Sequence, residues 1–108
     1  MDLQPNFDQY DAIFGDDPAS YAEFLGALED TLSKAKKSLA AAALAEDWNV
    51  ISATRHSLKP TMTLLGAEPI NALLNEWRPS MSAVDPAPLT SAMDVVLAAV
   101  ANRKSQLG

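Results

Sequence analysis

Apolar residues recur along this chain at steps of three and four, the spacing that places side chains on one face of a helix. The pattern is longest after Asp17 and Pro18, where it continues for more than twenty residues. Asp is a favoured N-cap and Pro a favoured first helical residue, so the start of this helix is well marked. Its apolar positions are Tyr21, Phe24, Leu25, Leu28, Leu32, Ala35, Leu39 and Ala42.

Three shorter segments have the same helical spacing. A short helix is expected between Asn6, which can cap it, and Gly15, which can end it. Another is expected to stop or bend near Arg78, because Pro79 cannot continue a helix normally. A last helix follows the Asp-Pro-Ala-Pro sequence at 85–88, the clearest break in the chain. No convincing period-two strand pattern occurs, which favours an all-α fold.

The remaining helical segment follows Asp47 and carries the one histidine of the chain, His56. One face of this segment is apolar and consists of Ile51, Thr54, Leu58, Met62 and Leu65. At 100° per residue, His56 lies about 160° from the middle of that face, so its imidazole is expected to face solvent. Lys59 and Thr63 fall on the same outer side, and the segment contains no Asp or Glu before Glu68.

This segment resembles the signature of histidine-containing phosphotransfer (HPt) domains, small helical bundles that carry a phosphoryl group between receiver domains. The family pattern is a small residue, His, any residue, an aliphatic residue, Lys and usually Gly, with another Gly ten residues after the His. The matching residues are His56, Leu58, Lys59 and Gly66. Arg55 stands where the family often has Ala or Gly, and Pro60 stands where it usually has Gly.

The resemblance implies a fold that the helical pattern also favours. We expect an antiparallel up-down-up-down four-helix bundle, preceded by a short N-terminal helix. At 108 residues the chain has the size of one domain, so residues 1–108 are interpreted as a single HPt domain. A connection as short as the one before Asp47 forces the two helices it joins to run side by side in opposite directions.

The resemblance also implies a function in two-component phosphorelays. His56 would accept a phosphoryl group from a receiver-domain aspartate and pass it to another receiver, and Lys59 would orient the group. An exposed imidazole with an ordinary pKa near 6.5 is about three-quarters neutral at pH 7, so no dedicated base is needed. The expected partners are response-regulator receiver domains, a hybrid sensor histidine kinase, or both, with Mg²⁺ bound by the receiver.

Four further residues are assigned to the binding surface around His56. Arg55 would make a second positive contact, either to the phosphate or to an acidic rim of the partner. Pro60, Thr63 and Gly66 would lie where the partner approaches. Pro60 has no N–H for the carbonyl of His56, so the helix is expected to kink there.

Composition excludes several other classes of function. A net charge of −6 argues against a nucleic-acid partner, and the absence of cysteine removes disulfides and thiolate catalysis. No Gly-rich phosphate loop is present, so neither ATP binding nor kinase or phosphatase turnover is expected. One histidine cannot supply a metal ligand set, and no cofactor is expected in this chain. The longest apolar run is too short to cross a membrane and no secretory leader is seen, which favours a cytoplasmic protein without membrane contact.

The alternative belongs to another class of protein. A helical interaction module could dock a receiver or another partner through the face from Ser52 to Thr63 without carrying phosphate. The departures at Arg55 and Pro60 favour this alternative. Loss of phosphoryl labelling without loss of binding on His56→Gln would separate the two functions.

Overall fold

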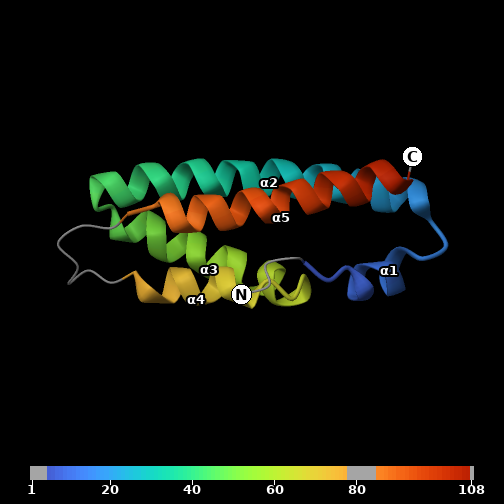
Figure 1. The fold of residues 1–108 in the computed structure, drawn as a ribbon, viewed down its shortest axis with the longest axis horizontal. Helices are drawn as coiled ribbons and strands as arrows, with labels where there is room; N and C mark the ends of the chain where they lie inside the picture. Colours follow the sequence, from blue (N-terminus) through green and yellow to red (C-terminus); the bar gives the residue numbers. More distant parts are fainter. Residues whose placement is uncertain (1–4, 78–84, 108) are drawn as a thin grey trace.

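The computed structural model describes residues 5–77 and 85–107, and its regular secondary structure within these ranges is all helical. Figure 1 shows the elements, which are α1 (Asp8–Phe14), α2 (Pro18–Ala45), α3 (Trp48–Leu64), α4 (Glu68–Glu76) and α5 (Ala87–Leu107). The boundary expected at Arg78 and Pro79 lies outside the described residues. Helix α4 ends just before it, and Trp77 already has an extended backbone.

Helices α2 and α3 begin at the capping residues that the sequence predicts, whereas the cap expected at Asn6 is wrong by one residue, because the residue before α1 is Phe7 and its side chain makes no capping hydrogen bond. The Asp17 carboxylate accepts a hydrogen bond from the backbone N–H of Ser20 at 3.0 Å, and Pro18 is the first residue of α2. The Asp47 carboxylate accepts one from the N–H of Val50 at 3.3 Å. These side chains satisfy backbone donors that have no partner in the first turn of a helix, which fixes where each helix begins.

Helices α2 and α5 form the long side of the molecule, which measures 49 × 24 × 19 Å (Figure 1). Ion pairs join them at two levels, from Lys36 to Asp94 and from Lys104 to Glu29. Helix α3 packs against α2, α4 packs against α3, and α4 also contacts α5. The side chains buried between them include Leu25, Leu32, Leu39, Ile51, Met62, Ile70, Leu74, Leu89, Met93, Val96 and Val100.

The short helix α1 packs against the first half of α2 through aromatic side chains. Phe14 lies 5.1 Å from Tyr21 and 5.2 Å from Phe24, measured between ring centroids, and Tyr10 lies 5.0 Å from Phe24. Figure 1 shows α1 on the same side of α2 and α5 as the α3–α4 pair, but farther along the long axis. No helix in the described ranges combines the length and the apolar character that a bilayer crossing requires.

Candidate functional site

The face of α3 that carries His56 is the one predicted from the helical period. Ile51, Met62 and Leu65 are fully buried and Leu58 is 3% exposed, so the apolar face is packed into the core. His56 lies on the opposite side of the helix and is exposed. Among the described residues, no hydrogen bond or ion pair involves its side chain. The core contacts therefore hold the backbone of α3 while the imidazole stays accessible to another protein.

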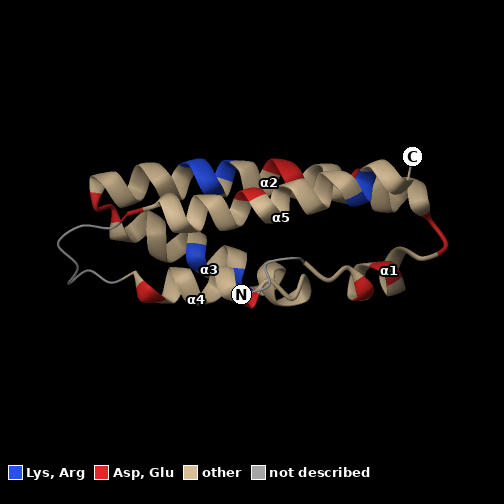
Figure 2. Cartoon of the chain, in the orientation of Figure 1, with Lys and Arg blue, Asp and Glu red and all other residues tan. Residues whose placement is uncertain are grey.

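Lys59 is exposed one helical turn after His56. Residues three apart on a helix have Cβ atoms about 5–6 Å apart, so the ammonium group can reach a group attached to the imidazole. Figure 2 shows Lys and Arg but no Asp or Glu on α3, while acidic residues stand at the preceding turn and at both ends of α4. The imidazole thus lies on a locally cationic helix of an acidic protein.

Pro60 lies inside α3, four residues after His56, and does not end the helix. It is exposed, so its ring does not displace core side chains. Because proline has no N–H, the carbonyl of His56 lacks the hydrogen bond that residue 60 would otherwise donate. The turn that carries His56 therefore has one internal bond fewer than a regular helical turn, and the kink expected there stays a prediction.

Arg55 points away from the outer face and toward the end of α4. One of its guanidinium nitrogens, Nη1, donates to the carbonyl oxygen of Leu74 at 3.0 Å and to that of Trp77 at 3.3 Å. The carbonyl of Leu74 also accepts a hydrogen bond from the backbone N–H of Trp77 at 3.1 Å, and a cation at the end of a helix suits the helix dipole. Arg55 thus caps α4. This structural role accounts for the arginine without a contact to the phosphate or to the rim of a partner.

Thr63 and Gly66 lie at the far end of α3, against the N-terminal segment. They line a cavity of about 290 Å³ together with Asn6, Asp8, Gln9 and Leu64. Thr63 accepts a weak hydrogen bond from the amide of Asn71 at 3.4 Å. Gly66 has a φ of +68°, a left-handed conformation that residues with a Cβ rarely adopt, so this turn favours glycine.

The six predicted site residues therefore fall into three groups. His56, Lys59 and Pro60 share the exposed surface of α3, Arg55 contacts α4, and Thr63 and Gly66 contact the N-terminal segment. The structure brings His56 and Lys59 together and does not add the other cation to them. Within the ranges that the structure covers, no three His, Cys, Asp or Glu residues gather in a way that could hold a metal ion.

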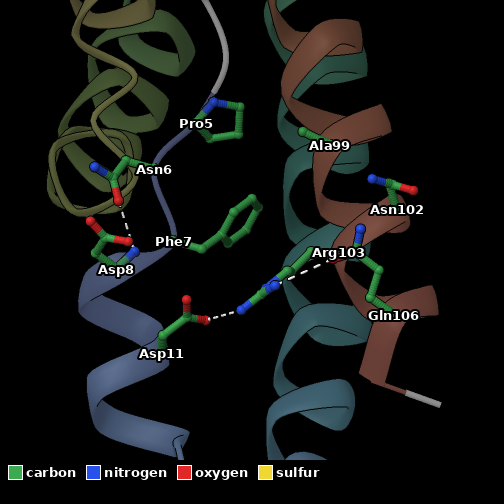
Figure 3. Close-up of a pocket in the computed structure, with 9 residues that line it drawn as sticks. All are labelled: Pro5, Asn6, Phe7, Asp8, Asp11, Ala99, Asn102, Arg103 and Gln106. Atoms are coloured by element: carbon green, nitrogen blue, oxygen red, sulfur yellow. Dashed lines mark hydrogen bonds and ion pairs between the residues drawn. The ribbon is translucent and has the colours of Figure 1, made fainter.

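A cavity of about 490 Å³ lies between the N-terminal segment and the last turns of α5 and is lined by no residue of α3 (Figure 3). Arg103 crosses this region and donates to the Asp11 carboxylate at 2.5 Å, and the hydroxyl of Tyr21 donates to the same oxygen at 2.8 Å. These hydrogen bonds, chiefly the one from Arg103, lower the pKa of Asp11. The guanidinium also lies 5.9 Å from the centre of the Tyr21 ring.

The contact of Arg55 with α4 is the feature of the site that sequence reasoning missed. A signal was present, because the helical period places Arg55 about 60° from the middle of the apolar face, at its edge rather than outside it. An arginine at such an edge can extend over the neighbouring helix. What it meets there is a pair of backbone carbonyls, and these have no signature in the sequence.

Comparison of the chain with protein-family models, with curated proteins and with solved structures gave no match. The functional assignment therefore depends on the residues of α3 and their surroundings.

Proposed function

We propose that this chain is a phosphoryl carrier of the HPt type, in which His56 accepts a phosphoryl group from a receiver-domain aspartate and passes it to a second receiver. The observation that carries the proposal is the exposed imidazole on a helix whose opposite face is buried, with Lys59 one turn away and no acidic residue on that helix. Such a nucleophile is accessible and is held by a rigid support.

The chemistry requires little from the carrier itself. A ring nitrogen of His56 would attack phosphorus and form a P–N bond while the bond from phosphorus to the aspartyl oxygen breaks. The leaving aspartate is a stable anion at neutral pH, because its ordinary pKa is near 4, so no acid is needed to protonate it. Transfer to the second receiver is the same exchange in reverse.

Lys59 would hold and orient the phosphoryl oxygens. Exposed ion pairs contribute less than about 1 kcal/mol, and a doubly charged phosphate exceeds this only modestly. Lys59 therefore assists transfer and does not drive it. The receiver would bring Mg²⁺, which neutralises charge on the phosphoryl group during transfer.

The fold that suits this function is an antiparallel up-down-up-down four-helix bundle with a short N-terminal helix. The packing of α2 against α5 and α3, of α3 against α4 and of α4 against α5 supports this arrangement, since these pairs close a ring. Phosphorelay between receivers also implies a cytoplasmic protein.

Incubation with a phosphorylated receiver domain tests the proposal. Wild-type protein is expected to acquire label in an acid-labile, base-stable bond, as a phosphorylated imidazole does, and His56→Gln is expected to acquire none. Binding of the receiver to His56→Gln, measured by calorimetry, should persist because only the nucleophile is removed. Labelling of His56→Gln at the wild-type rate would refute the assignment.

The Lys59→Ala variant measures how much Lys59 contributes to the rate of phosphoryl transfer. It is expected to be labelled more slowly than wild type, by about threefold to tenfold, and still completely. Lys37→Ala, which removes an exposed cation from α2, is the matched control and should transfer at the wild-type rate.

A second candidate is an interaction module that binds a receiver or another partner through the face from Ser52 to Thr63 without phosphate. The observation in its favour is that Pro60, which departs from the HPt pattern, is exposed on this face. This candidate predicts that wild type and His56→Gln bind a receiver equally and that neither is labelled.

A further inference from the structure

The hydrogen bonds of Arg55 join the turn that carries His56 to the end of another helix. Arg55 is half-buried, and its Nη1 reaches both Leu74 and Trp77. Helix α4 ends between these two residues, at Glu76. Arg55, which directly precedes His56, therefore ties the last turn of α4 to α3. We call this contact the α3–α4 joint.

The α3–α4 joint lies next to the turn of α3 that lacks a backbone hydrogen bond. Pro60 leaves the carbonyl of His56 without its helical donor, so the turn from 56 to 60 is held by fewer bonds than its neighbours. The buried residues Ile51 and Leu58 keep α3 pressed against the core on either side. These contacts oppose any large rotation of α3, because it would expose the buried side chains, but apolar packing has no preferred direction and so opposes a small rotation less strongly.

A bond at the edge of the apolar face opposes such a small rotation. Arg55 extends sideways from α3 to α4, so rotation of α3 about its axis would lengthen both of its hydrogen bonds. The same rotation would swing the imidazole of His56, one residue later, away from its direction. Reaction rates depend steeply on such alignment, since a displacement of about 1 Å can reduce a rate by about 100-fold.

The acceptors of Arg55 are also uncharged. Two carbonyl oxygens bind the guanidinium, and no carboxylate in residues 5–77 and 85–107 forms an ion pair with it. The hydrogen bonds of Arg55 therefore do not depend on the ionisation of a partner.

We propose that Arg55 is a positioning residue for phosphoryl transfer: by capping α4 it fixes the rotation of α3 and so the direction of the His56 imidazole. This inference rests on the proposed carrier function. It replaces the direct contact with phosphate or partner that the sequence suggests for Arg55 with an indirect role through the backbone of α3.

Two variants and two measurements test it. Arg55→Met keeps the apolar stem and removes the donors, while Arg55→Lys keeps a cation and a donor that can reach a carbonyl. Amide hydrogen exchange reports the joint itself without any phosphate. Single-turnover transfer from a phosphorylated receiver, measured over a range of receiver concentrations, separates the maximal rate from the apparent affinity. Lys37→Met serves as the charge-matched control on α2.

For Arg55→Met we expect faster amide exchange in α3 around His56 and at the end of α4, with α2 and α5 unchanged. The maximal transfer rate should fall by about tenfold while the apparent receiver affinity changes by less than about twofold. Arg55→Lys should recover most of the maximal rate. Lys37→Met should match wild type in both measurements.

Three results would overturn the inference. They are unchanged exchange in α3 and α4 of Arg55→Met, an unchanged maximal rate, or a loss confined to receiver affinity, which indicates a direct contact with the partner. If no receiver labels wild-type protein, the proposed function fails, and hydrogen exchange together with the NMR linewidth of the His56 ring still decides whether Arg55 holds this turn.

Discussion

Two arginines in this molecule each join a pair of helices, but their acceptors differ. Arg55 of α3 donates to backbone carbonyls at the end of α4, whereas Arg103 of α5 donates to the carboxylate of Asp11 on α1. A carboxylate neutralises a guanidinium, and a carbonyl does not. Within the described residues, the α3–α4 joint therefore consists of a cation bound to neutral acceptors, while the α1–α5 joint pairs its cation with a carboxylate.

This difference in acceptors distinguishes a contact that only holds a helix in place from one that lies next to the proposed site. Arg103, Asp11 and Tyr21 form a closed cluster in which each charged group already has a partner, as expected of a contact that holds α1 in place. The Arg55 joint also holds two helices together, but its acceptors are backbone carbonyls that carry no charge. Only the Asp11 cluster contains a carboxylate, so only that joint should weaken in acid.

The strongest expected effect on stability comes from Pro60→Ala. Proline in a helix interior costs about 3 kcal/mol, and its restriction of the unfolded chain returns about 1 kcal/mol, so Pro60→Ala should raise the free energy of unfolding by about 2 kcal/mol. The restored N–H of residue 60 would bind the carbonyl of His56. Urea unfolding of the variant and of wild type measures the change.

The same substitution sharpens the interpretation of Arg55. If Arg55 compensates for the missing bond of that turn, Arg55→Met should cost less stability and less transfer rate in the Pro60→Ala background than in wild type. A double-mutant cycle gives this coupling directly. Equal costs in the two backgrounds would mean that the two residues act independently.

A smaller effect is expected for Arg103→Met. The ion pair with Asp11 is partly exposed, and together with the contact to the Tyr21 ring it should contribute about 1 kcal/mol to the free energy of unfolding. Phosphoryl transfer should stay within about twofold of the wild-type rate, because the hydrogen bonds of the α1–α5 joint involve no residue of α3. A loss of maximal transfer rate as large as that of Arg55→Met would break the distinction between the two joints.

The smallest expected effect is a pH dependence of the α1–α5 joint. The hydrogen bonds from Arg103 and Tyr21 lower the pKa of Asp11 in the folded state. The resulting stability is complete above the ordinary pKa of about 4 and is lost as the pH falls through the lower folded value. The difference in unfolding free energy between wild type and Asp11→Asn should therefore shrink as the pH falls from about 6 to about 3.

The α3–α4 joint provides the internal comparison for this experiment. Backbone carbonyls do not titrate, so amide protection around His56 should be independent of pH over the part of this range where the protein stays folded, after correction for the intrinsic exchange rate. A constant difference between wild type and Asp11→Asn at all pH values would show that the carboxylate of Asp11 has the same pKa in the folded and unfolded chain.

Much of the fold could be predicted because its signals are local. The Asp17 and Asp47 caps, the buried face of α3 and the exposure of His56 all follow from relations within a few residues of one another. The order of the helices follows from the breaks between them. By contrast, the position of α1 beside the first half of α2 depends on aromatic contacts that the sequence pattern does not rank.

The sequence by itself determined the helical content, the starts of α2 and α3, and the presence of one exposed imidazole with a lysine a turn away. The tertiary structure decided what Arg55 and Arg103 do. Arg55 contacts carbonyls 19 and 22 residues farther along the chain, and Arg103 contacts a carboxylate 92 residues away. Periodicity shows which side of a helix is buried, but only the packing of helices determines which groups lie opposite a long side chain, because that depends on the relative rotation and shift of two helices.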